Sequence, residues 1–284
     1  MKYTFTLLFG FLAFISFAQK NKEVKLNWKI ERNENLSYQT VMNEIDTTTI
    51  DFNFGRLYKD FSDSTKTQKA QNLFKKLNES YKNIDLVAKL TNKGYGVVDI
   101  VLETKPKDKN VKSDSSGNGP QQMMKFMNQG VMLRGSVYET GEIHSFWVNS
   151  SQRNLIALFF QLPSKPVKIG DTWSLDINLI SNDQNFICDS SFKLNKVTFV
   201  DLKKIKGETI AVLKYEIIEY VKGSFNAPSF TGKVNKTETM MEFTYQGIAE
   251  FSIDKGRWIS YDGILGMEAT GTMTAHAKKE IVAY

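Results

Sequence analysis

The sequence predicts a mainly β protein: a strongly curved antiparallel sheet, or an incomplete barrel, built from two similar halves. Three observations predict it. Apolar and polar residues alternate strictly in several segments, glycine-containing turns separate these segments, and the order of hairpins recurs in the two halves of the chain. One amphipathic helix and one or two short helices are expected to accompany the sheet.

Alternation with a period of two is clearest in residues 24–30, 173–179 and 241–253. This period places one face of a strand in the core and the other in water. Residues 241–253 would span about 40 Å as a strand, which is longer than an ordinary strand. A strand of that length must twist and coil, so the sheet that contains it should be strongly curved.

Four tight turns join the predicted strands, and each contains a glycine: Gly94, Gly141, Gly207 and Gly256. A tight hairpin needs a residue with positive φ, a conformation that glycine adopts without steric cost. These turns therefore predict four antiparallel hairpins.

Helical spacing of apolar residues predicts one amphipathic helix over about 66–82, with Thr65 and Gln68 as a capping box. A short helix is expected at 120–130. Residues 151–160 form an apolar run that fits either a short helix or a buried strand, and we favour the helix.

Residues 19–284 are expected to form a single β-rich domain with half-repeats at about 24–160 and 161–284. Pro163 and Pro166 should keep the joint between the halves extended, and Gly170 should turn the chain into the second half. The alternative is that unrelated hairpins follow the same order by coincidence. A polar insertion at about 104–119 is expected to be mobile.

Residues 1–18 have the features of a cleavable export signal: a positive charge at Lys2, an apolar core, and small residues before the expected cleavage between Ala18 and Gln19. The alternative, a membrane anchor, would need about 20 apolar residues. The apolar run is shorter, so we expect no transmembrane segment after signal removal.

Cys188 is the only cysteine, which excludes an intramolecular disulfide. We expect its side chain to be a small buried hydrophobe. Export without disulfides indicates the periplasm or the exterior of a Gram-negative bacterium. The formal net charge is +6, with its densest basic run at residues 105–112. An exported protein seldom meets nucleic acid, so this run is expected to be a solvated loop.

No local pattern of catalytic residues is present, and we assign no catalytic, cofactor-binding or metal-binding residue. His144 and His276 lack the paired spacing of a histidine metal site. Ser190 and Lys193 match the Ser-x-x-Lys spacing of some hydrolases, but in a strand this spacing places the two side chains on opposite faces. The protein is therefore not expected to be an enzyme. A hydrolase with two carboxylates from different strands stays an alternative, because such a pair leaves no local spacing.

Met123, Phe126, Met127 and Met132 cluster after the polar insertion. Flexible thioethers line adaptable apolar surfaces in some binding proteins, so these residues are predicted contacts for a hydrophobic small molecule or lipid. The alternative is that they only fill the core. An outer-membrane β-barrel is a further alternative, because alternation does not distinguish an apolar interior from an apolar exterior.

The stretch LPSKPVKIGDTW, preceded by LRGSVYETGEIHSFW and followed by VTFVDLKKIKGETIAVLKYEI, resembles an uncharacterised family of exported proteins, found mainly in Bacteroidota. The family is defined only as a domain of unknown function, so the resemblance implies no reaction, ligand or catalytic residue. Many members carry a lipobox cysteine, which this chain lacks. The sequence thus predicts a non-catalytic envelope protein that acts as a binding or structural module.

Overall fold

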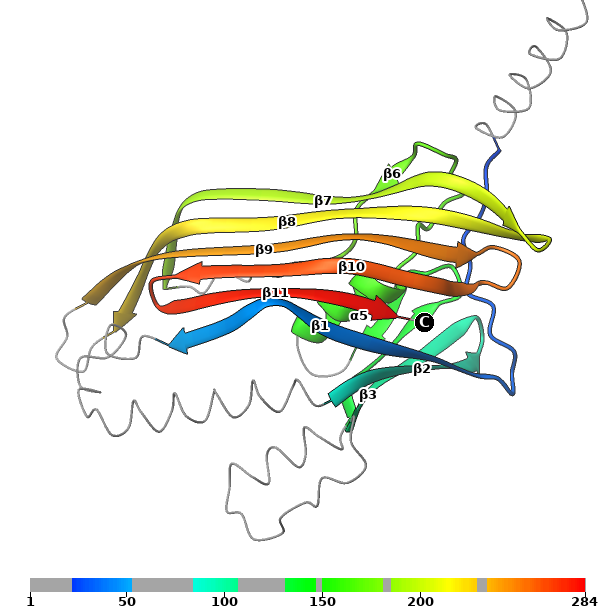
Figure 1. Cartoon of the computed structure of the whole chain (residues 1–284), viewed down its shortest axis with the longest axis horizontal. Helices are drawn as coiled ribbons and strands as arrows, with labels where there is room; N and C mark the ends of the chain where they lie inside the picture. The colour runs from blue at the N-terminus through cyan, green and yellow to red at the C-terminus, as the bar shows by residue number, and fades with distance from the viewer. Residues whose placement is uncertain are drawn as a thin grey trace, which may run out of the picture.

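The computed structural model describes residues 22–52, 84–106, 131–146, 150–180, 185–228 and 234–283. They form one antiparallel sheet of eleven strands, which is not closed, and one helix (Figure 1). The predicted fold class, mainly β with a curved antiparallel sheet, is confirmed. The elements are β1 (Asn35–Phe52), β2 (Ile84–Gly94), β3 (Val97–Pro106), β4 (Val131–Tyr138), β5 (Ile143–Phe146), α5 (Ser150–Phe160), β6 (Thr172–Trp173), β7 (Phe186–Ile205), β8 (Glu208–Pro228), β9 (Val234–Ser252), β10 (Arg257–Thr270) and β11 (Met273–Ala283).

The strand order is β5-β4-β3-β2-β1-β11-β10-β9-β8-β7-β6. Strands from residues 24–160 therefore lie together on one side of the sheet, and those from 161–284 lie together on the other. The two sets meet where β1 pairs with β11, in a register that runs from Thr40 opposite Ala283 to Phe52 opposite Met273. The chain thus forms one continuous sheet, with edges at β5 and β6.

The four predicted hairpins are confirmed: β2–β3, β4–β5, β7–β8 and β9–β10. The glycine in each turn has a positive φ, from 61° at Gly256 to 88° at Gly141. A side chain at Gly141 would also collide with the backbone of Leu162, so this turn packs directly against the joint between the halves.

One face of the sheet, called here the concave face, packs against α5 and carries the core. In β9 the side chains of Tyr245, Ala249 and Phe251 are buried on this face, whereas Ile248 is exposed on the other. Figure 1 shows α5 behind the strands β10, β11 and β1. The helix that the sequence favoured over a buried strand for residues 151–160 is therefore confirmed, and it lies where it positions the candidate site.

Two segments predicted as strands lie almost entirely outside the strands of the sheet. Residues 24–30 keep the expected alternation of burial, yet they form only one isolated bridge, between Val24 and Val167. Their remaining backbone bonds go to turns: Trp28 N donates to Glu139 O, and Lys29 N donates to Gly256 O. A period of two reports an extended chain with one buried side, and it does not require a neighbouring strand.

The second such segment is residues 173–179, of which only Trp173 lies in a strand, β6. Beyond it the backbone is held by side chains instead of a strand. The side-chain amide of Asn195 accepts a hydrogen bond from Leu175 N and donates one to Leu175 O. Glu219 Oε2 accepts hydrogen bonds from the backbone nitrogens of Leu179 and Ile180. This segment therefore crosses the concave face next to β7 and β8.

Several predictions lie outside the described residues: the signal peptide with its cleavage site at Ala18 and Gln19, the helix at 66–82 and the short helix at 120–130. The polar insertion predicted at about 104–119 overlaps the described residues only at its start, where β3 continues to Pro106 and Thr104 is 5% exposed opposite Leu86. Among the described residues, no helix combines the length and apolar composition needed to cross a bilayer.

Candidate functional site

A cavity of about 140 Å³ lies between α5 and the concave face of the sheet. It straddles the junction of β1 and β11, with β2, β3 and β4 on one side and β10 on the other. The residues around it are Tyr38, Thr40, Met42, Leu86, Ala88, Leu102, Leu133, Leu155, Leu158, Phe159, Phe160, Trp258, Tyr261, Leu265, Ile281 and Ala283.

Strand register brings the sheet side of this wall together. Tyr38, Thr40 and Met42 alternate along β1 and therefore point to one face. Thr40 pairs with Leu86 on β2 and with Ala283 on β11, so three neighbouring strands contribute side chains at the same level. The wall is thus a direct product of alternation within each strand and of pairing between the two halves.

Helix α5 forms the opposite wall, and aromatic side chains hold its C-terminal end. Tyr261 Oη donates to Leu158 O (3.1 Å), Trp258 Nε1 donates to Phe159 O (2.8 Å), and Trp28 Nε1 donates to Phe160 O (3.0 Å). The last carbonyls of a helix have no partner within the helix, so they accept these three hydrogen bonds without cost to the helix itself. The C-terminal end of α5 is therefore fixed against the sheet.

The N-terminal part of α5 is held by the segment that follows β6. The Asn154 amide donates to Asn178 O (2.6 Å) and accepts from Asn178 N (2.8 Å), and Arg153 forms an ion pair with Asp176. Contacts at both ends make the helix a fixed wall of the cavity.

The wall carries no charged side chain from the described residues. Two of its hydroxyl groups are already bonded: Tyr38 Oη accepts a hydrogen bond from Trp258 N (3.0 Å), and Tyr261 Oη binds the helix. Burial raises the pKa of both tyrosines well above its ordinary value, so both stay neutral. Apolar cavities of about 150 Å³ stay dry and accept molecules such as benzene, which is the behaviour we expect of this one.

Burial decreases along the cavity in one direction. Tyr38 on β1 is buried, whereas Met42, farther along the strand, is half-buried. Tyr261 on β10 is buried and Leu265 is half-buried, and on the helix Leu158 is 4% exposed whereas Leu155 is 37% exposed. The cavity is therefore closed beside the aromatic side chains that hold the C-terminal end of α5. It opens beside Met42, Leu155 and Leu265, a position called here the mouth.

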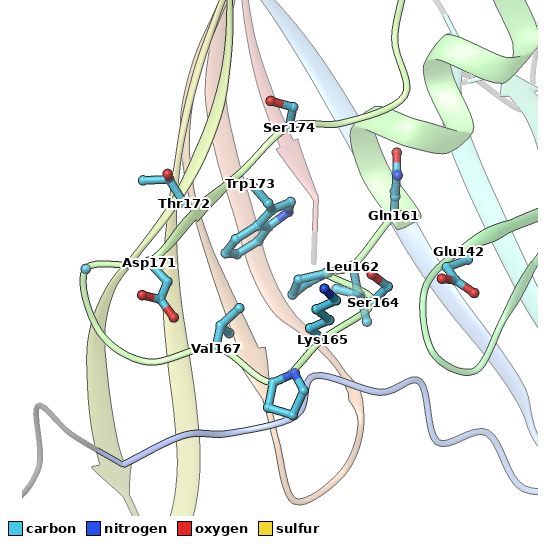
Figure 2. Close-up of a pocket in the computed structure, with 13 residues that line it drawn as sticks. Glu142, Gln161, Leu162, Ser164, Lys165, Val167, Asp171, Thr172, Trp173 and Ser174 are labelled. Carbon is cyan, nitrogen blue, oxygen red and sulfur yellow. The ribbon is translucent and has the colours of Figure 1, made fainter.

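A second hollow, of about 660 Å³, lies at the joint between the halves and is formed by Glu142 and residues 161–167 and 170–174 (Figure 2). Polar groups of this loop are bonded within it: Asp171 Oδ2 accepts from Lys168 N, and Gln161 Oε1 accepts from Asp176 N. Pro163, Pro166 and Gly170 line this hollow. Gly170 lies in a turn with a φ of 97°, as predicted, whereas Ser164 and Lys165 between the two prolines form a bend. The hydrogen bonds of Asp171 and Gln161 hold the walls of the hollow in place.

The predicted ligand contacts are only partly described. Met123, Phe126 and Met127 lie outside the described residues, whereas Met132 lies at a register shift of β4, next to the cavity residue Leu133. The aromatic and aliphatic residues of β1, β10 and α5 that surround the cavity were not predicted from the sequence. Their alternation was visible, but nothing local showed that these strands would face one helix.

Cys188 is exposed, so the prediction that it is buried is wrong. It lies on β7 at a register shift between Cys188 and Ser190, in a part of the strand whose side chains are mostly exposed. Ser190 and Lys193 lie on opposite faces as predicted, because Ser190 pairs with Lys222 while Lys193 pairs with Glu219 and forms an ion pair with it (2.7 Å).

The two histidines lie on separate strands. His144 Nδ1 on β5 is 3.0 Å from Ser136 Oγ, and its ring contacts Tyr138 edge-on. His276 on β11 lies between Glu268 and Asp46. Within the described ranges, no group of three or more His, Cys, Asp or Glu side chains is arranged to hold a metal ion.

Comparisons of the chain with models of known protein families, with curated proteins and with solved structures find no match.

Proposed function

We propose that the protein is a non-catalytic binding protein of the bacterial envelope, which holds an apolar ligand between α5 and the concave face. The observation that carries this proposal is the cavity itself. It is apolar, its tyrosine hydroxyls are bonded to backbone groups, and it has a mouth. An apolar group that enters the cavity is removed from water, and the tyrosine hydroxyls keep their hydrogen bonds to the backbone.

The composition of the wall favours binding over chemistry. Binding sites for small molecules are mostly apolar with few polar groups, whereas general acid–base or nucleophilic catalysis needs titratable groups within reach of the substrate. The described wall offers the Thr40 hydroxyl and two tyrosines whose pKa is raised by burial. It therefore suits a ligand that is held and released unchanged.

The location in the envelope rests on the sequence. Residues 1–18 have the composition of an export signal, and the joint resembles a family of exported proteins. We propose that the chain is exported to the periplasm or beyond and that it belongs to that family.

Filling the cavity should abolish binding. Ala88 on β2 is 3% exposed and lines the cavity, so Ala88→Leu places a larger side chain in the space that the ligand would occupy. We expect the purified wild-type protein to bind 1-decanol, measured by isothermal titration calorimetry, and Ala88→Leu to lose at least tenfold in affinity, which corresponds to about 1.4 kcal/mol.

Lys89→Leu is the matched control, because Lys89 is the next residue of β2 and pairs with Glu103 at the surface. It should bind 1-decanol like the wild-type protein. Circular dichroism verifies that both variants are folded. Absence of binding to the wild-type protein, or equal binding to wild type and Ala88→Leu, would contradict the proposal and leave only a structural role.

A further inference from the structure

The mouth of the cavity is bordered by a lysine. On β11 the concave positions are the odd-numbered residues: Ala283 and Ile281 line the cavity, and Lys279 is the next position toward the mouth. Lys279 pairs directly with Leu265 of β10, which also lines the cavity. Directly paired residues have Cβ atoms about 5 Å apart. The ammonium group of Lys279 is therefore within reach of the part of a bound ligand that protrudes from the mouth.

Lys279 is half-buried, and its side chain forms no ion pair with another residue in the described part of the chain. Glu44 pairs with Lys279 in the β1–β11 register but is exposed and makes an interaction of its own. The neighbouring lysine, Lys278, points to the opposite face, where it lies near Asp46. Lys279 and Glu44 thus place one positive and one negative charge on the concave face at the end of an uncharged cavity, and Lys279 is the more buried of the two.

An apolar cavity with a half-buried cation at its mouth matches a ligand that has an alkyl chain and a negative end, provided that the headgroup meets Lys279 and not the more exposed Glu44. We infer that the ligand is a single-chain amphiphile with an anionic headgroup, whose alkyl chain enters the cavity and whose headgroup meets Lys279. This inference rests on the proposed function and adds the class of ligand. Decanoate is the probe, and 1-decanol is its neutral counterpart with the same chain length.

Titration calorimetry of the wild-type protein with decanoate is carried out at about pH 8, where the carboxylate is ionised and lysine is charged. The wild-type protein should bind decanoate more tightly than Lys279→Gln does, by roughly three- to tenfold, because one partly exposed charge-assisted contact is lost. Affinity for 1-decanol should be the same in both proteins. Added salt should weaken decanoate binding to the wild-type protein more than to the variant.

Lys278→Gln is the matched control, because it removes the same charge from the adjacent residue on the other face of β11. It should bind decanoate as the wild-type protein does. If Lys279→Gln binds decanoate as tightly as Lys278→Gln, the inference about the headgroup is wrong.

The two proposals fail separately. If Ala88→Leu abolishes binding of both probes while Lys279→Gln changes neither, the cavity binds neutral apolar ligands and only the anionic headgroup is ruled out. If Ala88→Leu leaves the binding of both probes unchanged, the cavity is not the site and both proposals fall.

Discussion

His276 is clamped between two carboxylates on the face of the sheet opposite the cavity. Its Nε2 lies 3.2 Å from Asp46 Oδ2 on β1, and its Nδ1 lies against Glu268 on β10. The hydrogen bond to Glu268 is the largest cause of a raised pKa for His276, and the bond to Asp46 is the next. The imidazole, when protonated, therefore links three adjacent strands, including the two that join the halves.

This triad predicts a pH dependence of stability. The folded pKa of His276 is raised above the unfolded value of about 6.5, so its contribution is fully present below that pH and is lost as pH rises through the folded pKa. The pKa of Asp46 is lowered by its bonds to Thr47 and His276, so the contribution of Asp46 is lost when the solution is acidified through the folded pKa. The triad should stabilise the fold most in mildly acidic solution.

His276→Gln should therefore lower the urea midpoint of unfolding at mildly acidic pH and lose this effect in alkaline solution. In a background that carries Asp46→Asn and Glu268→Gln, the same substitution should have no pH-dependent effect. A difference between wild type and His276→Gln that is constant across the pH range would contradict the role of the charged imidazole.

Individual side chains were the hardest level to predict from the sequence. Cys188 has an apolar neighbour at Phe186 and Ile187, which favoured burial, but exposure is decided by its place in β7 at a register shift, and only strand pairing reveals that place. Likewise, nothing in the spacing of Asp46, Glu268 and His276 indicates that they meet, because β1 and β11 are far apart in the sequence.

At the level of elements, α5 shows how a short helix can be held without strong helix propensity. Isolated helices of this length are marginal in water, and packing must stabilise them. Three aromatic donors from two segments bind its last carbonyls: Trp28 from the segment before β1, and Trp258 and Tyr261 from β10. The helix therefore depends on the sheet.

Removing one of these donors tests that dependence. Tyr261→Phe deletes one hydroxyl and leaves Leu158 O without its bond in a buried position, which should lower the free energy of unfolding by about 1–2 kcal/mol. Tyr95→Phe is the control, because Tyr95 is fully exposed in the β2–β3 turn. Urea denaturation of both variants provides the measurement, and equal midpoints would show that the bond to α5 does not stabilise the fold.

β7 pairs with β6 only at Val197 and Thr198, and the rest of its outer side carries features that oppose pairing with another sheet. Its register shifts after Cys188 and after Phe199, so its outer edge is irregular, and Lys193 and Lys196 add charge along it. Bulges and lysines on edge strands are common means of preventing such association.

Elements were predicted well where a turn marked their ends. The glycine turns gave the correct hairpins because positive φ is a local requirement. The segments 24–30 and 173–179 show the limit, since their alternation revealed burial on one side but not whether a neighbouring strand was present. For the helix at 150–160, an apolar run fitted two structures, and only its position across the concave face explains the outcome.

At the level of the whole molecule, the two sets of strands share one core. Trp28, from the segment before β1, contacts Phe160 at the end of α5 as well as Phe251 and Trp258 from β9 and β10. All four aromatic side chains are at most 6% exposed. Neither set of strands buries this cluster alone, so the described structure should unfold as one unit.

Trp28→Ala tests this cohesion. The cavity left in the aromatic cluster should lower the free energy of unfolding by about 3–5 kcal/mol. Far-ultraviolet circular dichroism and the fluorescence of the remaining tryptophans should report the same single transition in urea, displaced to lower denaturant. Lys25→Ala, an exposed residue of the same segment, should leave the midpoint unchanged. Two separate transitions in either protein would show that the halves unfold independently.

The sequence predicted the fold class of the whole molecule, but it did not predict that the two sets of strands would join in one sheet. Alternation and turns are local signals, whereas the β1–β11 pairing joins residues more than 200 positions apart and left no local trace. The relatedness of the two halves stays a prediction. The cavity was beyond reach for the same reason, because it is enclosed by strands from both sets and by the helix between them.

The β1–β11 pairing also has a consequence for how the protein is made. During synthesis β1 emerges early, but its neighbour β11 is the last of the described strands to emerge. The edge of β1 that pairs with β11 therefore has no partner while more than 200 residues are added. The cavity wall, to which Ile281 and Ala283 of β11 contribute, is therefore complete only once β11 has been made. A chain that must cross a membrane before it folds would benefit from such a delay.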